Sequence, residues 1–380
     1  MLLPLILVLA AAPATPPPAS EVEPDYLAFL QQAERGINAG QGEALDAHID
    51  IDRLFERISR GVSAPKEFAD SFKSGLRSQG MPFGKQLVTA RGANASFHLL
   101  NVRREAGLTR ALFRASSDAG LNYIDLDLER DPKGAVVIVD IYPYIAGEYV
   151  SESARHMYLA ALADVQQGML DKLMGKEQEF IKNMPKMQQM QRLLMEKKYQ
   201  AVLDTFEQLP ASMRQQKPVL LVEMTAAEKV SEAEYKRAIA TFEKAFPGDP
   251  SLDLVSIDGH LLRKDYPAVM STIDRLDSRV KDPYLKFLRA SVMLDKKDLP
   301  AAKKYLDEAV HADPHLTQAW FALIGLSLQE KNYAETSRLL TAIERDAGVA
   351  VSNLDGVKVY EGFVQSPEGK AWRKKHSQKH

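Results

Sequence analysis

Side chains that could support acid–base chemistry lie in the first half of the chain, on segments where apolar and polar residues alternate. Asp125 and Asp127 stand two residues apart on one segment, and Asp140 and Tyr142 stand two apart on the next. Residues two apart share one face of a β-strand. Paired carboxylates act as acid and base only where burial or mutual repulsion separates their pKa values. We expect Asp125 and Asp127 to be ionised on an open face of a sheet, which argues against catalysis.

His98 lies on another alternating segment and is the histidine that could enter a cavity of this half. A lone histidine is more commonly a core or surface residue with satisfied hydrogen bonds than a catalytic one. A small-ligand or enzymatic site built from His98, Asp140 and Tyr142 is therefore the alternative interpretation of the N-terminal half.

Arginines recur on the same segments, and two interpretations of them stay open. They could form a patch for phosphate or an acidic partner, or they could pair with Asp and Glu on an exposed face of neighbouring strands. No glycine-rich phosphate loop accompanies them, which favours pairing. The residues are Arg91, Arg103, Arg104, Arg110 and Arg114.

Two patterns contain possible metal ligands. Met184, Met187 and Met190 form an M-x-x-M-x-x-M run, whose thioethers could bind Cu(I) or could fill an irregular seam between two domains. No histidine or cysteine lies nearby in the sequence to complete a copper site, which favours the seam. His311 and His315 flank an Asp-Pro turn and so do not share a helical face, which argues against zinc.

The composition excludes several classes of protein. The 380 residues suffice for two or three domains of roughly 150 residues each. With 49 basic and 51 acidic residues the net charge is −2, which provides no field for binding nucleic acid or an anionic membrane. Cysteine is absent, which excludes disulfides and thiolate metal sites. Catalytic and dinucleotide-binding motifs are absent too, so we expect no cofactor and no enzymatic activity.

The first residues are typical of an export signal. Leu2–Ala12 is an apolar run that is too short to span a bilayer, since a spanning helix needs about 20 residues. Ala12 and Ala14 supply the small residues that a signal peptidase reads. We therefore expect a signal peptide at residues 1–14 with cleavage near Ala14, a proline-rich spacer at 15–23, a periplasmic or secreted protein, and no integral membrane span.

Residues 24–150 are expected to form an α+β domain. Three amphipathic helices, in the segments 26–37, 45–58 and 65–76, precede a change to alternation with a period of two. Short turns separate the alternating segments, which predicts an antiparallel sheet. The expected strands are Gln86–Arg91, Ser96–Arg104, Leu108–Ser116, Leu121–Arg130 and Ala135–Tyr144.

This order of elements resembles the cystatin-like or nuclear-transport-factor-two-like fold, over roughly residues 24–147. The resemblance implies a curved antiparallel sheet with helices packed on it. That fold is known both for small pockets with acid–base chemistry and for pure binding roles, so the fold alone does not decide the function. Residues 151–186 are expected to follow as a helical connector.

The second half repeats with a period near 34 residues. A charged or polar residue followed by Tyr or Leu recurs along it, and each pair is expected to begin a second helix after a short turn. The pairs are Lys198-Tyr199, Glu234-Tyr235, Asp265-Tyr266, Asp298-Leu299 and Asn332-Tyr333.

Two copies carry the same residue classes at the same spacing. The small residues allow helices to approach closely, the large ones fill the space between hairpins, and the proline ends the second helix. The positions are Tyr235, Ala238, Phe242, Ala245 and Pro250 in one copy, Leu299, Ala302, Leu306, Ala309 and Pro314 in the other, and Trp320 before Tyr333. The pattern resembles the tetratricopeptide repeat over residues 187–346. That resemblance implies an all-α solenoid that binds proteins without chemistry; an unrelated array of helical hairpins is the alternative.

Residues 347–380 are expected to hold a capping helix and a basic tail. Ser366-Pro367-Glu368 predicts a helix start, and Trp372 would cover the last apolar face. The basic tail could bind nucleic acid or lipid, but a solvated chain end is the favoured interpretation. The whole sequence therefore predicts an exported, non-enzymatic interaction protein that binds a peptide or protein through its repeats.

Overall fold

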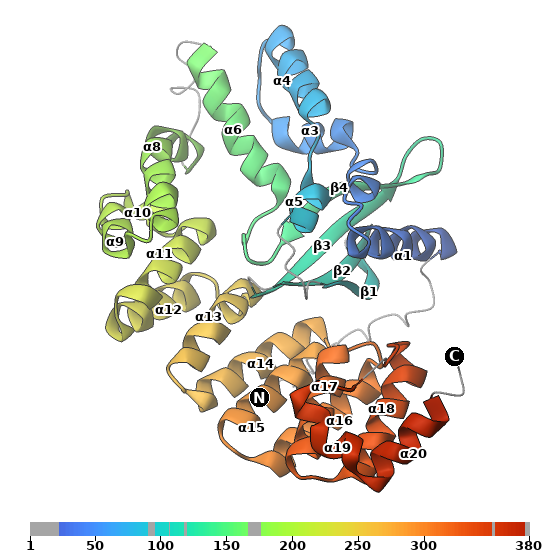
Figure 1. Cartoon of the computed structure of the whole chain (residues 1–380). Helices are drawn as coiled ribbons and strands as arrows, with labels where there is room; N and C mark the ends of the chain where they lie inside the picture. The colour runs from blue at the N-terminus through green and yellow to red at the C-terminus, as the bar shows by residue number, and fades with distance from the viewer. Residues whose placement is uncertain are drawn as a thin grey trace, which may run out of the picture.

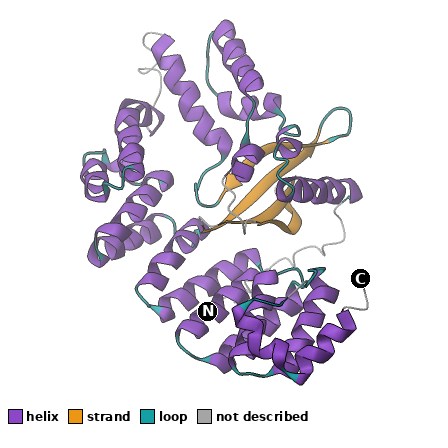
Figure 2. Ribbon diagram, in the orientation of Figure 1, coloured by secondary structure: helices purple, strands orange, loops and turns teal. Residues whose placement is uncertain are grey.

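The described residues are mostly helical, and the strands among them form one sheet. The computed structural model describes residues 23–89, 96–105, 107–117, 120–165, 176–351 and 354–376. The expected signal peptide and all of the spacer except its last residue lie outside the described residues. Figure 2 shows the strands together in a single sheet, with helices before and after it. An α+β N-terminal half followed by a helical half is therefore confirmed.

The first four helices match the three expected from the sequence, with the second one split in two, and a fifth, α5, was not expected. α1 has Pro24 in its first turn and buries a stripe that includes Leu30 and Ala33. The Asp50 carboxylate caps α3 by accepting two backbone N–H groups. The bounds are α1 (Pro24–Asn38), α2 (Glu43–Asp46), α3 (Ile51–Ser59), α4 (Lys66–Gln79) and α5 (Phe83–Thr89).

The expected strand Gln86–Arg91 is wrong over its described part, which is the end of helix α5. The Asp46 carboxylate accepts the N–H groups of Gly84 at 2.6 Å and Lys85 at 3.1 Å, and so caps this helix. A Cβ at Gly84 would lie 2.2 Å from the carbonyl oxygen of Gly42, so the two glycines pack backbone to backbone. These contacts come from α2, and local alternation of residues could not reveal them.

The other four expected strands are confirmed to within one residue at each end. They form an antiparallel sheet in the order β1-β2-β3-β4. One face packs on α1 (Figure 1), and there Phe97 and Phe113 stack with ring centroids 4.3 Å apart. The Asn38 side chain donates to and accepts from the Phe97 backbone, which closes part of the β1 edge. The strands are β1 (Ser96–Glu105), β2 (Leu108–Ser117), β3 (Gly120–Arg130) and β4 (Val136–Pro143).

Helix α6 (Val150–Val165) packs on α3 and α4 through aromatic residues. The Tyr158 ring lies 5.7 Å from that of Phe55 and 5.0 Å from that of Phe72, both edge to face. This helix therefore belongs to the N-terminal half, although we assigned residues 151–186 to a connector.

The helical half is a succession of helix pairs joined by short turns, and the two helices of each pair contact each other. Figure 1 shows these pairs following one another around the sheet. The first helices are α8 (Lys176–Met195), α11 (Lys217–Val230), α13 (Pro250–Leu262), α15 (Tyr284–Asp295) and α17 (Thr317–Gln329). The second helices are α9 (Tyr199–Glu207), α12 (Glu232–Ala245), α14 (Tyr266–Val280), α16 (Leu299–Ala312) and α18 (Tyr333–Ala347), and the short α10 (Ala211–Arg214) follows α9.

Four of these pairs share one turn, built around a lysine with positive φ. Between α15 and α16, Lys297 has a φ of 61° and its N–H donates to Leu294 O at 2.9 Å, while the N–H of Asp298 donates to Met293 O at 2.8 Å. This is the Schellman arrangement that ends a helix. The Asp298 carboxylate then accepts the Ala301 N–H and caps α16. The equivalent lysines are Lys197, Lys264 and Lys331. In these four pairs the second helix begins at the residue expected from the sequence.

The pair α11–α12 departs from this pattern, and two expectations about it are wrong. Ser231 alone joins the two helices and its hydroxyl caps α12, which therefore begins at Glu232 and not at Tyr235. Pro250 does not end α12 but is the first residue of α13, where its missing N–H costs nothing. A direct serine cap replaces the lysine turn here, so the second helix starts three residues early.

Most of the expected repeat positions are buried. Ala245 is the exception in α12, because the helix ends there and its side chain is exposed. Pro314 is exposed in the α16–α17 turn, and its carbonyl accepts the Trp320 Nε1–H at 2.8 Å. Tyr333 is partly buried, with its ring 6.2 Å from that of Phe363. The buried positions are Tyr235, Ala238, Phe242, Ala302, Leu306, Ala309 and Trp320.

The chain ends on a short helical element that covers the last pair. The Ser366 hydroxyl accepts the Gly369 N–H at 3.0 Å and caps α20, as expected from the sequence. Trp372 is buried against Phe363 in the core of that pair. The elements are η2 (Lys358–Tyr360), α19 (Glu361–Gln365) and α20 (Pro367–His376). The expected basic tail begins inside α20, and residues 377–380 lie outside the described part.

Candidate functional site

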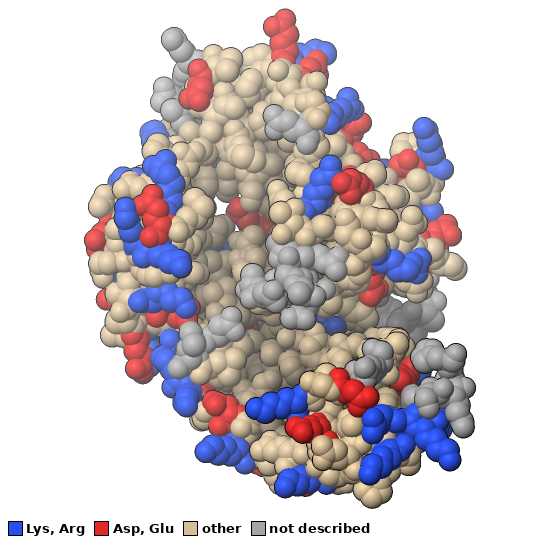
Figure 3. Space-filling view, viewed as in Figure 1, with Lys and Arg blue, Asp and Glu red and all other residues tan. Residues whose placement is uncertain are grey.

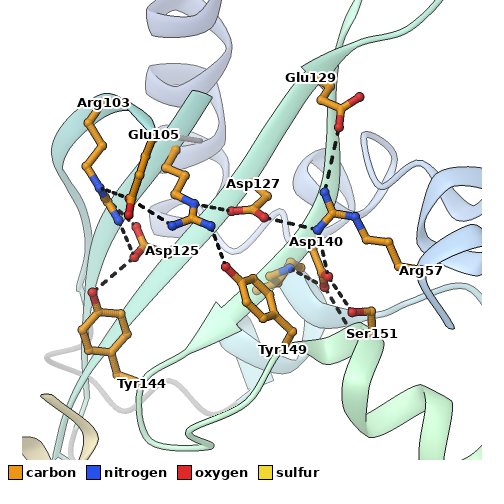
Figure 4. Close-up of polar contacts among 12 residues, drawn as sticks. Arg57, Arg103, Glu105, Asp125, Asp127, Glu129, Asp140, Tyr144, Tyr149 and Ser151 are labelled. Carbon is orange, nitrogen blue, oxygen red and sulfur yellow. Dashed lines mark hydrogen bonds and ion pairs between the residues drawn. The ribbon is translucent and has the colours of Figure 1, made fainter. Parts of the chain in front are cut away.

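The face of the sheet turned away from α1 carries a network of arginines, carboxylates and tyrosines (Figure 4). Arg103 on β1 donates two hydrogen bonds of 2.8 Å to the Asp125 carboxylate on β3. Tyr144 donates a third hydrogen bond to the same carboxylate at 3.2 Å. Bidentate pairing of this kind fixes both side chains in one orientation. Asp125 is therefore held by partners and is not a solvated surface group.

Asp127 lies two residues after Asp125 on the same face of β3 and is held between two arginines. Arg110 donates to Asp127 at 3.0 Å and to the Tyr149 hydroxyl at 3.0 Å. Arg57 of α3 lies 3.3 Å from Asp127 and 3.3 Å from Asp140, as Figure 4 shows. Asp127 and Asp140 face each other on β3 and β4, where two like charges would repel. The Arg57 guanidinium between them offsets that repulsion.

Asp140 is tied to the start of α6. Its carboxylate accepts the Ser151 hydroxyl at 2.6 Å and the Ser151 N–H at 3.1 Å. Burial raises the pKa of Asp140, and these hydrogen bonds oppose that shift. Burial also raises the pKa of Tyr149 to about 12 and places that of Tyr144 well above its ordinary range, so both phenols stay protonated at neutral pH. The arrangement holds strands, α3 and α6 together and is suited to rigidity more than to proton transfer.

We expected Asp125 and Asp127 on an open face of the sheet, and that expectation is wrong. They expose 6% and 1% of their surface. The helical half covers part of this face, because Leu112, Tyr123 and Tyr144 share one apolar cluster with side chains of α13, α14 and α15. The groups that contact Asp125 and Asp127 belong to the N-terminal half and are Arg103, Tyr144, Arg110 and Arg57. The sequence shows that these residues share a face, but which element covers that face depends on the tertiary structure.

A buried ion pair joins the two halves. Arg114 of β2 donates to the Asp282 carboxylate at 2.5 Å, and the Tyr123 hydroxyl donates to it at 2.9 Å. The Arg114 guanidinium also lies 5.2 Å from the ring centroid of Tyr284. Arg103, Arg104, Arg110 and Arg114 each pair with an acid, but the exposed face of paired neighbouring strands that we favoured is wrong. Asp125 and Asp127 are buried, and the partners of Arg104 and Arg114 are Glu23 and Asp282, outside the sheet. Arg91 lies outside the described residues.

A groove of about 510 Å³ lies between the N-terminal half and helices α8, α11 and α13. We call it the α11 groove. Figure 3 shows the surface hollowed between the N-terminal half and helices α8–α12. Ile145, in the loop after β4, lines the groove and is 54% exposed. Apolar side chains from both halves make much of the wall, namely Leu121, Leu194, Leu221, Val222, Leu254 and Val255.

A second cavity, of about 470 Å³, lies where β1 and α1 meet α17 and the turn before it. We call it the His98 cavity. His98 Nδ1 lies 2.8 Å from Glu34 Oε1, and its Nε2 lies 3.9 Å from Asp313 Oδ2. Asp140 and Tyr142 are on β4, at the opposite edge of the sheet, and do not line this cavity. The structure therefore does not bring together the three residues of the expected small-ligand site.

The expected metal ligands have other surroundings. Met190 is buried in an apolar cluster of α8, α9 and α11, and Met187 packs against it, which fits a hydrophobic seam. Copper binding at Met184, Met187 and Met190 stays the disfavoured alternative.

His311 Nδ1 lies 2.6 Å from the Asp307 carbonyl oxygen, while His315 lines the His98 cavity. Among the described residues, no group of three or more His, Asp and Glu side chains is placed to hold a metal ion.

Sequence reasoning did not single out Arg57, Lys217 or Asp282. Lys217 of α11 donates to the Tyr142 hydroxyl at 3.0 Å and lies 2.7 Å from the Asp249 carboxylate. Asp282 precedes a proline, which indicates a helix start and nothing about a distant arginine. The local sequence of these residues therefore carried no signal for their contacts.

Comparison with protein-family models, with curated proteins and with solved structures finds no match to this chain. Within the described ranges, no helix is both long enough and apolar enough to cross a membrane.

Proposed function

We propose that this protein is a non-enzymatic interaction protein that binds a peptide or protein segment in the α11 groove. The observation that carries the proposal is the set of apolar side chains that α8, α11 and α13 present to a space of about 510 Å³. Recognition grooves of this kind take apolar anchor residues from a helix or an extended segment. The groove bears both charge signs, with Glu148, Glu228 and Lys229 on its walls, so the anchors and not charge would provide affinity.

The position of the sheet supports this groove over the rest of the first-helix surface. Leu112 and Tyr123 of the sheet already pack against α13, α14 and α15. First-helix side chains of α8 and α11 line the groove beside that contact, together with the exposed Ile145. A partner can therefore reach the helical half here without displacing the sheet.

The recurrence of the helix pairs supports a binding role. We propose that they are repeats of the tetratricopeptide type, because four pairs share one lysine turn and Trp372 covers the last pair. Proteins of that family act as scaffolds, which agrees with the groove. The proposed assignment includes a cystatin-like or nuclear-transport-factor-two-like N-terminal half, and export directed by the apolar run Leu2–Ala12.

Ile145→Glu tests the groove. A peptide library displayed on phage is selected on the full chain, and the tightest peptide is labelled for fluorescence anisotropy. A carboxylate in an apolar wall should raise the Kd of that peptide by about tenfold or more, because an apolar anchor would lose its contact.

Val359→Glu is the matched control, because Val359 is an apolar residue of η2 that is 61% exposed and does not line the groove. This variant should bind the peptide as the unchanged chain does. Equal affinities of the two variants, or a selection that enriches no peptide, would contradict the proposal.

A further inference from the structure

The His98 cavity carries a second inference, which is independent of the α11 groove. α1, β1 and β2 form one side of it, and the α16–α17 turn and α17 form the other. Its volume of about 470 Å³ falls in the range of small-molecule sites, which also tend to lie where two parts of a protein meet.

Negative charge exceeds positive charge around this cavity. Glu34 and Asp313 line it, and Arg114 is the one arginine or lysine among its described lining residues. The Arg114 charge is already neutralised, since its Nη1 lies 2.5 Å from Asp282 and its Nη2 lies 3.6 Å from Asp313. Three carboxylates against one guanidinium leave a net charge of −2 when the two lining histidines are neutral. A cation entering the cavity would reduce that excess.

The geometry of the two lining carboxylates favours an ammonium group over a metal ion. Glu34 lies on the Nδ1 side of His98 and Asp313 on its Nε2 side, at 2.8 and 3.9 Å. Ligands on opposite sides of an imidazole do not converge on one metal ion, and no metal cluster is found among the described residues. An ammonium group needs no converging set of ligands, because a single carboxylate such as that of Glu34 can accept its hydrogen bond.

Phe321 supplies an apolar wall beside these charges. It lines the cavity from α17 and is 49% exposed. An aromatic ring contacts hydrocarbon and attracts a cation over its face. We propose that the His98 cavity binds an organic ammonium group attached to an apolar moiety. The ammonium donates to the Glu34 carboxylate, Asp313 adds negative charge on the other side of His98, and the apolar moiety rests on Phe321.

Isothermal titration calorimetry on the full chain tests the proposal with four probes. 2-Phenylethylamine carries the ammonium, while 2-phenylethanol and phenylacetate keep the ring and replace the cation with a neutral group and an anion. The amine should bind with a Kd at least about tenfold below that of the alcohol, since a charge-assisted hydrogen bond is lost in the alcohol. The tripeptide phenylalanyl-alanyl-alanine bears the same ammonium at a peptide terminus, so the tighter of the two ammonium probes identifies the source of the ligand.

Glu34→Gln should raise the Kd of the tighter ammonium probe by about tenfold, and Phe321→Ala should also raise that Kd. Glu67→Gln on the exposed face of α4 is the matched control and should leave the Kd unchanged. Phenylacetate binding as tightly as the amine would overturn the proposal. Equal Kd values for the Glu34→Gln and Glu67→Gln variants, or no heat with either ammonium probe, would overturn it as well.

Discussion

Buried charges at single residues are balanced unevenly in this protein. Asp125 accepts two hydrogen bonds from Arg103, whereas Glu223 on α11 is also buried and its Oε2 has no hydrogen-bond partner in the described structure. The nearest cation, Arg237, lies 3.7 Å from Glu223. Burial raises the pKa of Glu223 to about 7, against the opposing charge of Arg237. Glu223 is therefore a residue at which stability should depend on pH near neutrality.

Glu223→Gln should stabilise the fold increasingly as the pH rises from about 4.5 to about 7. The folded state binds the Glu223 proton more tightly than the unfolded state does. The protonated glutamate therefore adds to the stability of the unchanged chain at pH 4.5, and this contribution is lost as the pH rises through about 7. Glutamine does not titrate, so the stability of the Glu223→Gln variant does not fall through this titration. Urea unfolding of both chains at pH 5, 6, 7 and 8 measures the difference.

Glu243→Gln on the exposed face of α12 serves as the control, and its effect should be small and the same at each pH. The difference in the free energy of unfolding between Glu223→Gln and the unchanged chain should vary with pH. A difference that stays constant from pH 5 to pH 8 would show that Glu223 is solvated.

At the scale of elements, the helix pairs depend on turns that the side chains do not favour. Lys297 and its three equivalents adopt a left-handed backbone that costs an L-residue about 1–2 kcal/mol. The turn persists because its backbone hydrogen bonds satisfy carbonyl groups at the end of the first helix, and because the residue after it caps the second helix. The four turns therefore share one geometry that includes a strained residue.

Lys297→Gly should raise the free energy of unfolding by about 0.5–1 kcal/mol, because glycine adopts positive φ without a steric cost and loses part of that gain to chain entropy. Lys304→Gly, in the middle of α16, should lower the free energy of unfolding by about 1 kcal/mol. Urea midpoints of the two variants decide the matter. If Lys297→Gly and Lys304→Gly lower the urea midpoint by the same amount, the turn carries no strain.

At the scale of the molecule, the N-terminal half and the helical half share a core. The sheet contributes Leu112 and Tyr123 to an apolar cluster with α13–α15, and Arg114 reaches the buried Asp282 beside it. Breaking a buried ion pair leaves a charge without a partner in a poorly solvated place. We therefore expect the two halves to unfold together in the unchanged protein.

Asp282→Asn should lower the free energy of unfolding by about 3 kcal/mol and should separate the unfolding of the two halves. Both tryptophans, Trp320 and Trp372, lie in the helical half, so their fluorescence follows that half while far-UV circular dichroism follows the whole chain. The two urea transitions should coincide in the unchanged chain and diverge in the variant.

Asp346→Asn is the control, because Asp346 pairs with Arg345 on the exposed face of α18 and its loss should change little. Coincident transitions in Asp282→Asn, with a midpoint equal to that of Asp346→Asn, would show that the ion pair does not join the halves.

The sequence by itself predicts the elements whose causes are local. Period-two alternation gave the four strands to within one residue, and Ser366 before Pro367 predicted the cap of α20. The polar-then-Tyr or Leu pairs located the starts of four second helices, because a turn of constant geometry precedes each. Each of these features depends on residues within about one helical turn of one another.

The tertiary structure alone decides what covers each surface. α5 is helical because Asp46 caps it from another helix, and the buried Asp127 is held by Arg57, which comes from α3 and not from a neighbouring strand. Arg114 and Asp282 are 168 residues apart in the chain, and no local pattern links them. Burial and long-range pairing depend on which elements meet, and the shared core of the two halves brings them together.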